Sequence, residues 1–146
     1  MVVPDVVASL LGSLRQYIKE LQAEQNVSYE QFVADLHLRR FVEHTLQIAI
    51  QSCLDIAAHL IAEEGWREFA DYRDAFTVLA ENGVVPAEFL PTLHRMAQFR
   101  NLMVHQYARI EPEAVYGILT RGVEDLERYA AEIARWLTAR GYTGCD

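Results

Sequence analysis

The chain has 146 residues, of which 51% are hydrophobic and 23% charged, and its 13 basic and 21 acidic residues give a net charge of −8. The apolar content excludes a disordered chain, and a chain of this length buries roughly 70% of its unfolded surface, so we expect a single domain over residues 1–146. A nonspecific nucleic-acid coat needs a basic face, which this composition does not supply, so any nucleic-acid function must use a local site.

Three segments in the first half of the chain have the period of helices. The first should begin with Asp5 as its N-cap, because apolar residues follow it at three-four spacing. Ser28 and Gln31 form a capping-box signature that opens a short helical turn. A long helix should then run from about Leu36 to Glu64, with Gly65 as its terminator.

The second half of the chain continues the helical pattern. A shorter helix should begin near Asp71 and end at Asn82. In the segment 86–105, Pro91 either kinks a helix or marks its first turn after a one-turn prelude. The last helix should run over residues 112–140. Because no stretch alternates with period two, we predict an all-α fold, an antiparallel helical bundle of four to five main helices.

One arginine interrupts an apolar helix face. At ~100° per residue, the apolar stripe of the segment 86–105 consists of Phe89, Leu90, Leu93, Met96, Ala97 and Val104. Arg100 lies at the centre of this stripe, where an unpaired guanidinium would cost several kcal/mol. Either Arg100 forms a structural ion pair with a carboxylate such as Glu43 or Asp55, or it lines a cleft and binds an anion there.

His105 follows Arg100 by five residues, in the string RNLMVHQY. Five helical steps turn a side chain by about 140° and advance it by ~7.5 Å, so the two side chains should diverge within one chain. They would meet if the helix unwound before His105, or if a second subunit approached across a two-fold axis. The end of a helix favours protonated histidine, which suits a proton donor but is also the pattern of a simple C-terminal cap.

A polar ridge and a second apolar face indicate an interface. The ridge lies along the long predicted helix at intervals of four residues and consists of Glu43, Gln47, Gln51, Asp55 and His59. Such a ridge is usually solvated, but here Phe41 and Ile48 flank it. Phe99 and Leu102 likewise project away from the stripe that carries Arg100, so we expect a second protomer against this surface.

Other chemical motifs are absent from the sequence. It has no HExxH, paired CxxC, glycine-rich phosphate loop or GxSxG, and four further histidines lack ligand spacing: His37, His44, His59 and His94. We therefore expect no metal and no cofactor. Cys53 and Cys145 form no disulfide framework, which favours reduced thiols in a cytoplasmic protein. No uninterrupted apolar run reaches ~18 residues, and the acidic Asp5 argues against a secretory signal.

The string RNLMVHQY, from Arg100 to Tyr107, resembles the HEPN superfamily, and specifically the HepT-like toxins of bacterial and archaeal toxin–antitoxin pairs. The family form is RNxLVHxY, and Met103 stands where leucine is commoner. Three further strings resemble the family's other helices: FVADLHLRRFVEHTLQIAIQSCLDIAAHLIAEEG, FTVLAENGVVP and PEAVYGILTRGVEDLERYAAEI. The resemblance covers about Leu14 to Leu137.

This resemblance implies an HEPN-like bundle that forms a homodimer or a higher assembly and cleaves RNA without a metal at the subunit interface. Arg100 would hold the scissile phosphate, His105 would act as general base or acid, and Asn101 would support the site. Tyr107 would be the tyrosine that a nucleotidyltransferase antitoxin modifies with AMP, adding negative charge beside the cleft. The net charge also suits an alternative, a non-catalytic helical module that docks a nucleotidyltransferase.

Overall fold

The computed structural model describes residues 4–142, and these form helices joined by turns, without strands. In chain order the α-helices are α1 (Asp5–Gln22), α2 (Tyr29–Ala34), α3 (Leu36–Glu64), α4 (Tyr72–Glu81), α5 (Leu90–His105), α6 (Pro112–Gly117) and α7 (Val123–Ala139). Two short 3-10 turns, η1 (Ala87–Phe89) and η2 (Tyr107–Arg109), flank α5, and a π-helical turn, η3 (Ile118–Gly122), joins α6 to α7. The predicted all-α class is confirmed.

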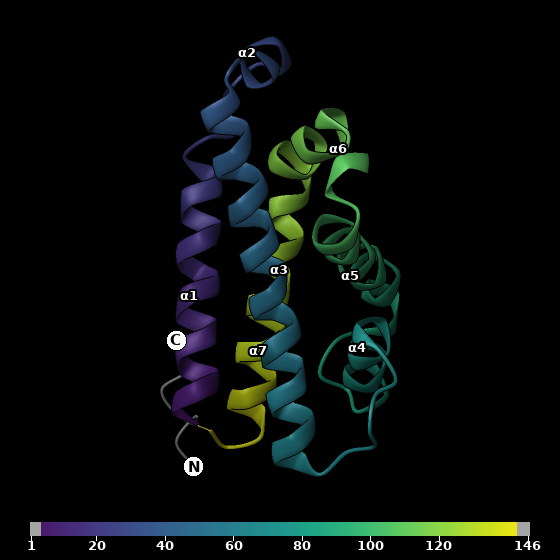
Figure 1. Ribbon diagram of the computed structural model, residues 1–146. Coiled ribbons are helices and arrows are strands. Elements are labelled where there is room, and N and C mark those ends of the chain that lie inside the picture. The colour runs from purple at the N-terminus through teal and green to yellow at the C-terminus, as the bar shows by residue number, and fades with distance from the viewer. Residues whose placement is uncertain (1–3, 143–146) are drawn as a thin grey trace.

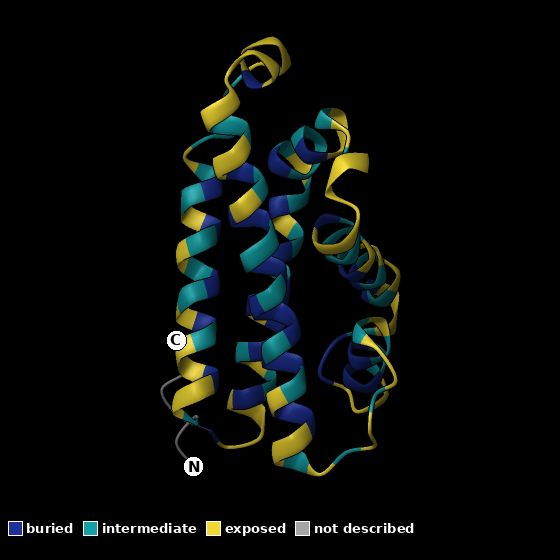
Figure 2. Cartoon of the chain, in the orientation of Figure 1, coloured by how far each residue is buried: buried dark blue, intermediate teal, exposed yellow. Residues whose placement is uncertain are grey.

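Helix α3 is the centre of the bundle. It packs along α1 over much of its length, with α7 on the same side and the pair α4 and α5 on the other (Figure 1). The helix faces that meet are buried, whereas α2 projects from one end with a largely exposed surface (Figure 2). Tyr129 of α7 crosses the core, where its hydroxyl donates a 2.7 Å hydrogen bond to the carbonyl of Cys53 in α3.

By length and composition alone, α3 is apolar enough to cross a membrane. However, 61% of its most apolar 18-residue window is buried against the rest of the protein, as expected of a core helix. The high mean apolarity follows from packing on two opposite sides, because a helix that is covered on two sides has fewer positions left for polar residues.

The predicted helix boundaries around α2, α3 and α4 are confirmed. Ser28 accepts a hydrogen bond from the backbone of Gln31, whose side chain accepts one from Ser28 in return. Gly65 ends α3 with a φ of 68°, a left-handed conformation that costs glycine little. The Asp71 carboxylate caps α4 by accepting from the backbone N–H of Asp74.

Three details differ from the simplest sequence interpretation or decide between its alternatives. Pro4, not Asp5, is the N-cap of α1, so Asp5 lies in the first turn, where its charge still stabilises the helix dipole. Pro91 lies in the first turn of α5 after the η1 turn, so it starts the helix and does not kink it. The predicted last helix is interrupted by η3, which ends at Gly122.

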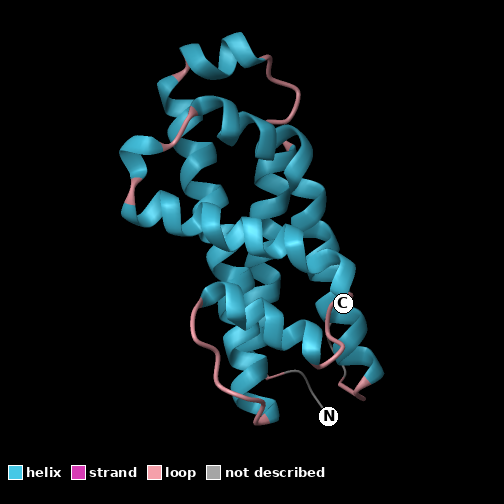
Figure 3. Cartoon of the chain, turned by 90° about the vertical axis from the view of Figure 1, so that its right-hand side faces the viewer, coloured by secondary structure: helices cyan, strands magenta, loops and turns pink. Residues whose placement is uncertain are grey.

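Figure 3 shows the face of the bundle to which the next section turns, where α4 and α5 cross in front of the longer helices. A hydrogen bond of 2.9 Å between Thr77 of α4 and His94 of α5 ties these two helices together. Together with α3, they position the polar side chains near the C-terminal end of α5.

Candidate active site

Arg100, on α5, is held by three different elements of the fold. Its Nε donates to Oε1 of Gln51 on α3 at 2.8 Å, and its Nη1 donates to Oδ1 of the adjacent Asn101 at 3.1 Å. The guanidinium carbon lies 4.7 Å from the centre of the Tyr72 ring on α4, in a cation–π contact. The half-buried guanidinium is therefore oriented by two neutral amides and an aromatic ring.

The structural ion pair that sequence considerations allowed for Arg100 is not formed. Gln51 stands between Arg100 and Asp55, because its amide nitrogen donates to the Asp55 carboxylate at 2.8 Å. This bond fixes the amide so that its oxygen faces Arg100. Glu43, the other candidate, accepts a hydrogen bond from Tyr107 instead.

Arg100 and His105 line one groove within a single chain. The groove has a volume of about 510 Å³ and is lined by Phe69, Asp71, Tyr72, Arg100, Asn101 and His105. The expected divergence of the two side chains does not keep them from lining the same groove, and Asn101 explains why. Asn101 precedes His105 by four residues, which places both on one helix face, and it also bonds to Arg100.

His105 is the last residue of α5 and is exposed. The helix ends there because the backbone of Gln106 leaves the helical region, with φ −139° and ψ 45°. His105 thus reaches solvent from the groove, which leaves it accessible to a substrate or to a second subunit.

Tyr107, in the η2 turn, lies beside the groove with 52% of its surface exposed. Its hydroxyl donates a 2.6 Å hydrogen bond to Oε1 of Glu43 on α3. This bond, followed by desolvation, raises the pKa of the Tyr107 phenol, while the charges of Arg40 and Arg39 act in the opposite direction. The bond fastens η2 to α3 and so fixes the segment that follows His105.

Part of the apolar stripe predicted on α5 is wrong. Phe89, Leu93 and Ala97 are buried as expected, but Val104 is 40% exposed and Met103 is buried in its place. The stripe fails at this end because α5 leaves the core near its C-terminus. There its side chains form the wall of an open groove.

Sequence considerations missed three groove residues on the α3–α4 connection and the start of α4. Phe69 carried no signal, Tyr72 had the pattern of an ordinary packing residue, and Asp71 was expected only as the approximate start of a helix. Their role depends on how the α3–α4 connection folds against α5. Helical periodicity does not report that contact.

A second cavity, of about 310 Å³, lies where α3, α5 and α7 meet, and it does not bring together polar side chains in the way that the groove does. Its lining is mainly apolar, with Arg95 and Asp125 as its charged residues. Within residues 4–142, no group of three or more His, Cys, Asp or Glu side chains is placed to hold a metal ion. Cys53 is a free, buried cysteine whose thiol pKa is raised by burial, and Cys145 lies outside the described residues.

Comparisons with known proteins agree on one family. A family model described as ribonuclease HepT-like matches residues 14–133, which include all of α5 and η2. The chain is similar to the mRNA nuclease HepT of Shewanella oneidensis, with 27% identity over 125 residues, 86% of this chain and 93% of that protein. It is also similar to the tRNA nuclease HepT of Aphanizomenon flos-aquae, with 21% identity over 135 residues, 92% of this chain and 91% of that one.

A solved structure extends this similarity to three dimensions. The tri-AMPylated HEPN toxin of Shewanella oneidensis, in complex with the MNT antitoxin, matches with a TM-score of 0.82 and 26% sequence identity. The match covers 91% of this chain and 99% of that toxin. The whole bundle is therefore shared, not a single helical hairpin.

Proposed function

This chain belongs to the HepT-like ribonuclease family, and on that premise we propose that it is the RNA-cleaving toxin of a toxin–antitoxin pair. The observation that carries the proposal is the single groove in which Arg100, Asn101 and His105 meet. Arg100 has no carboxylate partner there, so its charge remains available to a phosphate. The relatives named as mRNA and tRNA nucleases support RNA as the substrate class.

The proposed reaction uses the RNA's own 2′-hydroxyl as the nucleophile. His105 accepts the proton from this hydroxyl as the oxygen attacks the neighbouring phosphorus, and the bond to the 5′-oxygen breaks as that oxygen takes up a proton. The products are a cyclic phosphate and a free 5′-hydroxyl. Arg100 stabilises the charge that develops on the phosphoryl oxygens. Because attack comes from within the substrate, we propose that cleavage needs no metal and that DNA is resistant.

We further propose that the working unit is a homodimer. Six of the large apolar side chains exposed on the described chain lie on α2, the start of α3, the end of α5 and η2: Tyr29, Val33, Leu36, Phe41, Val104 and Tyr107. The bond between Tyr107 and Glu43 joins these elements into one surface beside the groove. A second copy packed on the apolar side chains of this surface, with the Tyr107 phenol left open to solvent, would bring a second His105, so that one imidazole serves as base and the other as acid.

Tyr107 is the proposed site of neutralisation by a nucleotidyltransferase antitoxin. Its phenol is exposed and lies two residues beyond His105, so an attached AMP would lie at the mouth of the groove. The added phosphate would repel an RNA phosphate approaching Arg100. The relative whose structure is solved is itself AMPylated and bound to an antitoxin. RNA and nucleoside triphosphates meet in the cytoplasm, which we propose as the site of action.

Purified variants test the nuclease directly. Arg100→Ala and His105→Ala should each reduce cleavage of labelled RNA by at least about 100-fold, since each removes a group that acts on the transition state. Arg95→Ala and His59→Ala are matched controls on α5 and α3, and both should cleave like the parent. All reactions contain EDTA to test metal independence.

Two results would count against this proposal. Undiminished cleavage by His105→Ala would reject the catalytic assignment. Absence of RNA cleavage by the parent dimer at any concentration would favour the alternative, a binding module for the nucleotidyltransferase.

A further inference from the structure

Several arginines of this chain differ in the kind of partner that they contact. Four of them form salt bridges with carboxylates: Arg67, Arg128, Arg135 and Arg140. Around the groove and η2 the arginines bond to neutral groups instead. Arg100 bonds to two amides, and Arg109 donates to the side-chain oxygen of Gln106 at 3.0 Å. The charge of a guanidinium with neutral partners is not neutralised by a nearby carboxylate, so it can attract an anionic ligand.

Two more arginines of the second kind begin α3. Arg39 donates to the backbone carbonyl of Val33, and its Nε is buried without a hydrogen-bond partner among the described residues. Arg40 is exposed and forms no salt bridge within residues 4–142. Arg39 and Arg40 precede Glu43 by four and three residues, one turn of α3, and Glu43 is bonded to Tyr107, so both lie near η2. The carboxylate of Glu43, which follows these arginines on α3, accepts the hydrogen bond of the Tyr107 phenol.

Arg40 continues the face of α3 that holds Arg100. Arg40, Gln47 and Gln51 lie within about 40° of one another around α3, because the intervals of seven and eleven residues are close to whole turns. At 1.5 Å per residue, Arg40 lies about 16 Å from Gln51 along the helix, a span of several nucleotides of single-stranded RNA. Arg100 is bonded to Gln51, so a ridge of α3 connects the two arginine positions.

Acidic residues are absent from the two segments that carry these arginines, and the carboxylates nearby are Glu43 and Asp55 on α3 and Asp71 in the groove. No Asp or Glu occurs within residues 36–42 or 89–110, although the chain as a whole has 21 acidic residues. In a protein of net charge −8, these two segments are therefore locally positive. A local positive surface of this kind attracts a polyanion even when the whole molecule is acidic.

We propose that Arg39 and Arg40 form a second phosphate-binding site, which holds the RNA backbone several nucleotides from the bond cleaved at Arg100. This inference rests on the proposed nuclease function. RNA is favoured over an acidic protein because Arg40 shares a helix face with Gln51, which positions Arg100, so one strand that leaves the groove along α3 would reach both arginine positions. The site sets affinity and the direction of the strand, and takes no part in bond cleavage.

Salt-dependent binding tests the proposal in the His105→Ala background, in which a labelled single-stranded RNA of mixed sequence stays intact. Each phosphate contact in a single strand contributes about 0.7 to the slope of log K against log salt. Replacing both Arg39 and Arg40 by alanine should therefore lower the magnitude of the slope by about 1.4, with affinity falling most at low salt. Replacement of both by lysine should retain most of the slope, because lysine keeps the charge.

The control variant carries alanine at Arg135 and Arg140, which removes two charges from α7 and its C-cap, and it should bind RNA like the parent. In the cleaving protein, Arg40→Ala should raise KM by a larger factor than it lowers kcat, which a general loss of fold would not produce.

An unchanged slope in the Arg39 and Arg40 variant, with normal RNA binding by the parent, overturns the second site while the nuclease stands. The same holds if this variant loses affinity for a nucleotidyltransferase partner but not for RNA. If the His105→Ala parent binds no RNA at any salt concentration, the proposed function fails and the second site with it.

Discussion

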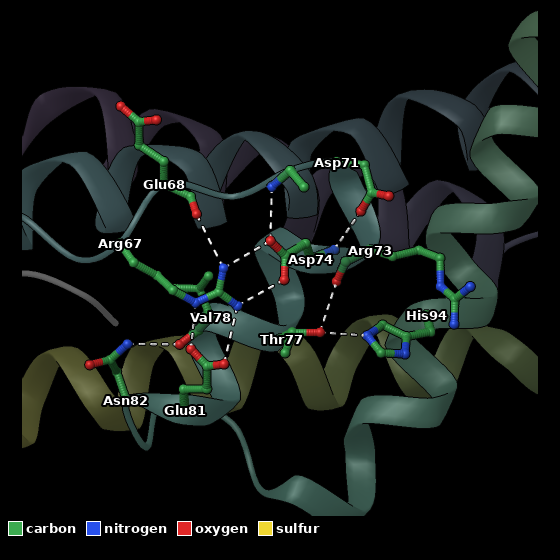
Figure 4. A network of polar contacts seen from close by, with 11 residues as sticks. Arg67, Glu68, Asp71, Arg73, Asp74, Thr77, Val78, Glu81, Asn82 and His94 are labelled. Carbon is green, nitrogen blue, oxygen red and sulfur yellow. Dashed lines mark hydrogen bonds and ion pairs between the residues drawn. The ribbon is translucent and has the colours of Figure 1, made fainter.

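Arg67 and Arg100 both make several polar contacts, yet they are held in opposite ways. Arg67 lies between two carboxylates, with Nη2 at 2.8 Å from Asp74 and Nε at 2.8 Å from Glu81 (Figure 4). Arg100 lies between two amide oxygens and against an aromatic ring. Carboxylates neutralise a guanidinium, whereas amides orient it and leave its charge in place. The first arrangement suits a structural clamp, and the second suits an anion-binding site.

The clamp and the site are nevertheless connected. Arg67 also donates to the carbonyl of Glu68, and Asp74 accepts from the backbone N–H of Ala70, so the network fixes the connection between α3 and α4. That connection and the start of α4 supply Phe69 and Tyr72 to the groove. An arginine that is neutralised by two carboxylates thus helps to hold one wall of the groove, while the arginine of the groove itself has no carboxylate partner.

The largest expected effect follows from replacing each arginine by lysine. Arg100→Lys should reduce RNA cleavage by about 100-fold, because a lysine ammonium cannot bond to Gln51 and Asn101 and stack on a ring at the same time. Arg67→Lys should leave cleavage within about threefold of the parent, because one charge still faces Asp74 and Glu81. Single-turnover cleavage of labelled RNA measures both effects.

Equal losses in the two lysine variants would contradict the comparison. It would mean that Arg100 acts only through the stability of the fold. Thermal melts of both proteins serve as the control, and Arg100→Lys should unfold within a few degrees of the parent.

The fold could be predicted from the sequence far better than the site could. Caps and breakers such as Ser28, Gly65 and Asp71 act locally, so the helix boundaries could be predicted from the residues themselves. The family assignment is likewise confirmed by the family model. Arg100 stood out because a cation interrupted an apolar stripe, and His105 because of its spacing from it.

The partners of these residues could not be predicted, because they come from distant elements. Gln51 lies 49 positions from Arg100 in the sequence, and nothing in the polar ridge of α3 distinguished it from Glu43 or Asp55. Tyr72 reaches Arg100 through the packing of α4 on α5. The roles of Arg100, Asn101, His105 and Tyr107 in cleavage and modification stay predictions.

A smaller effect is expected at Tyr72, the ring that connects the two regions. Tyr72→Leu keeps an apolar side chain but removes the cation–π contact at 4.7 Å, worth about 0.5–2 kcal/mol. Arg100 would then sample other positions, so kcat for RNA cleavage should fall about tenfold while the melting temperature changes little. Tyr72→Phe keeps the aromatic face and should retain most of the activity. If the phenylalanine variant falls as far as the leucine variant, the hydroxyl and not the ring matters.

The smallest effect concerns the clamp itself and depends on pH. The Arg67 guanidinium, together with the N–H of Ala70, lowers the pKa of Asp74 from 3.8 to about 2. A carboxyl whose pKa is lower in the folded state stabilises the fold above its unfolded pKa, and this contribution disappears as the pH falls through the folded value. Arg67→Ala should therefore lower the melting temperature slightly at pH 7, and the difference from the parent should vanish between about pH 4 and pH 2.

Arg135→Ala is the control for this measurement, because it removes an exposed arginine whose partner is Glu132, outside the clamp. Its melting temperature relative to the parent should not follow the titration of Asp74. A difference between parent and Arg67→Ala that persists unchanged at pH 2 would show that Arg67 acts by packing and not by charge. In that case the two arginines would differ in surroundings alone, and the contrast between a neutralised clamp and a charged site would lose its electrostatic basis.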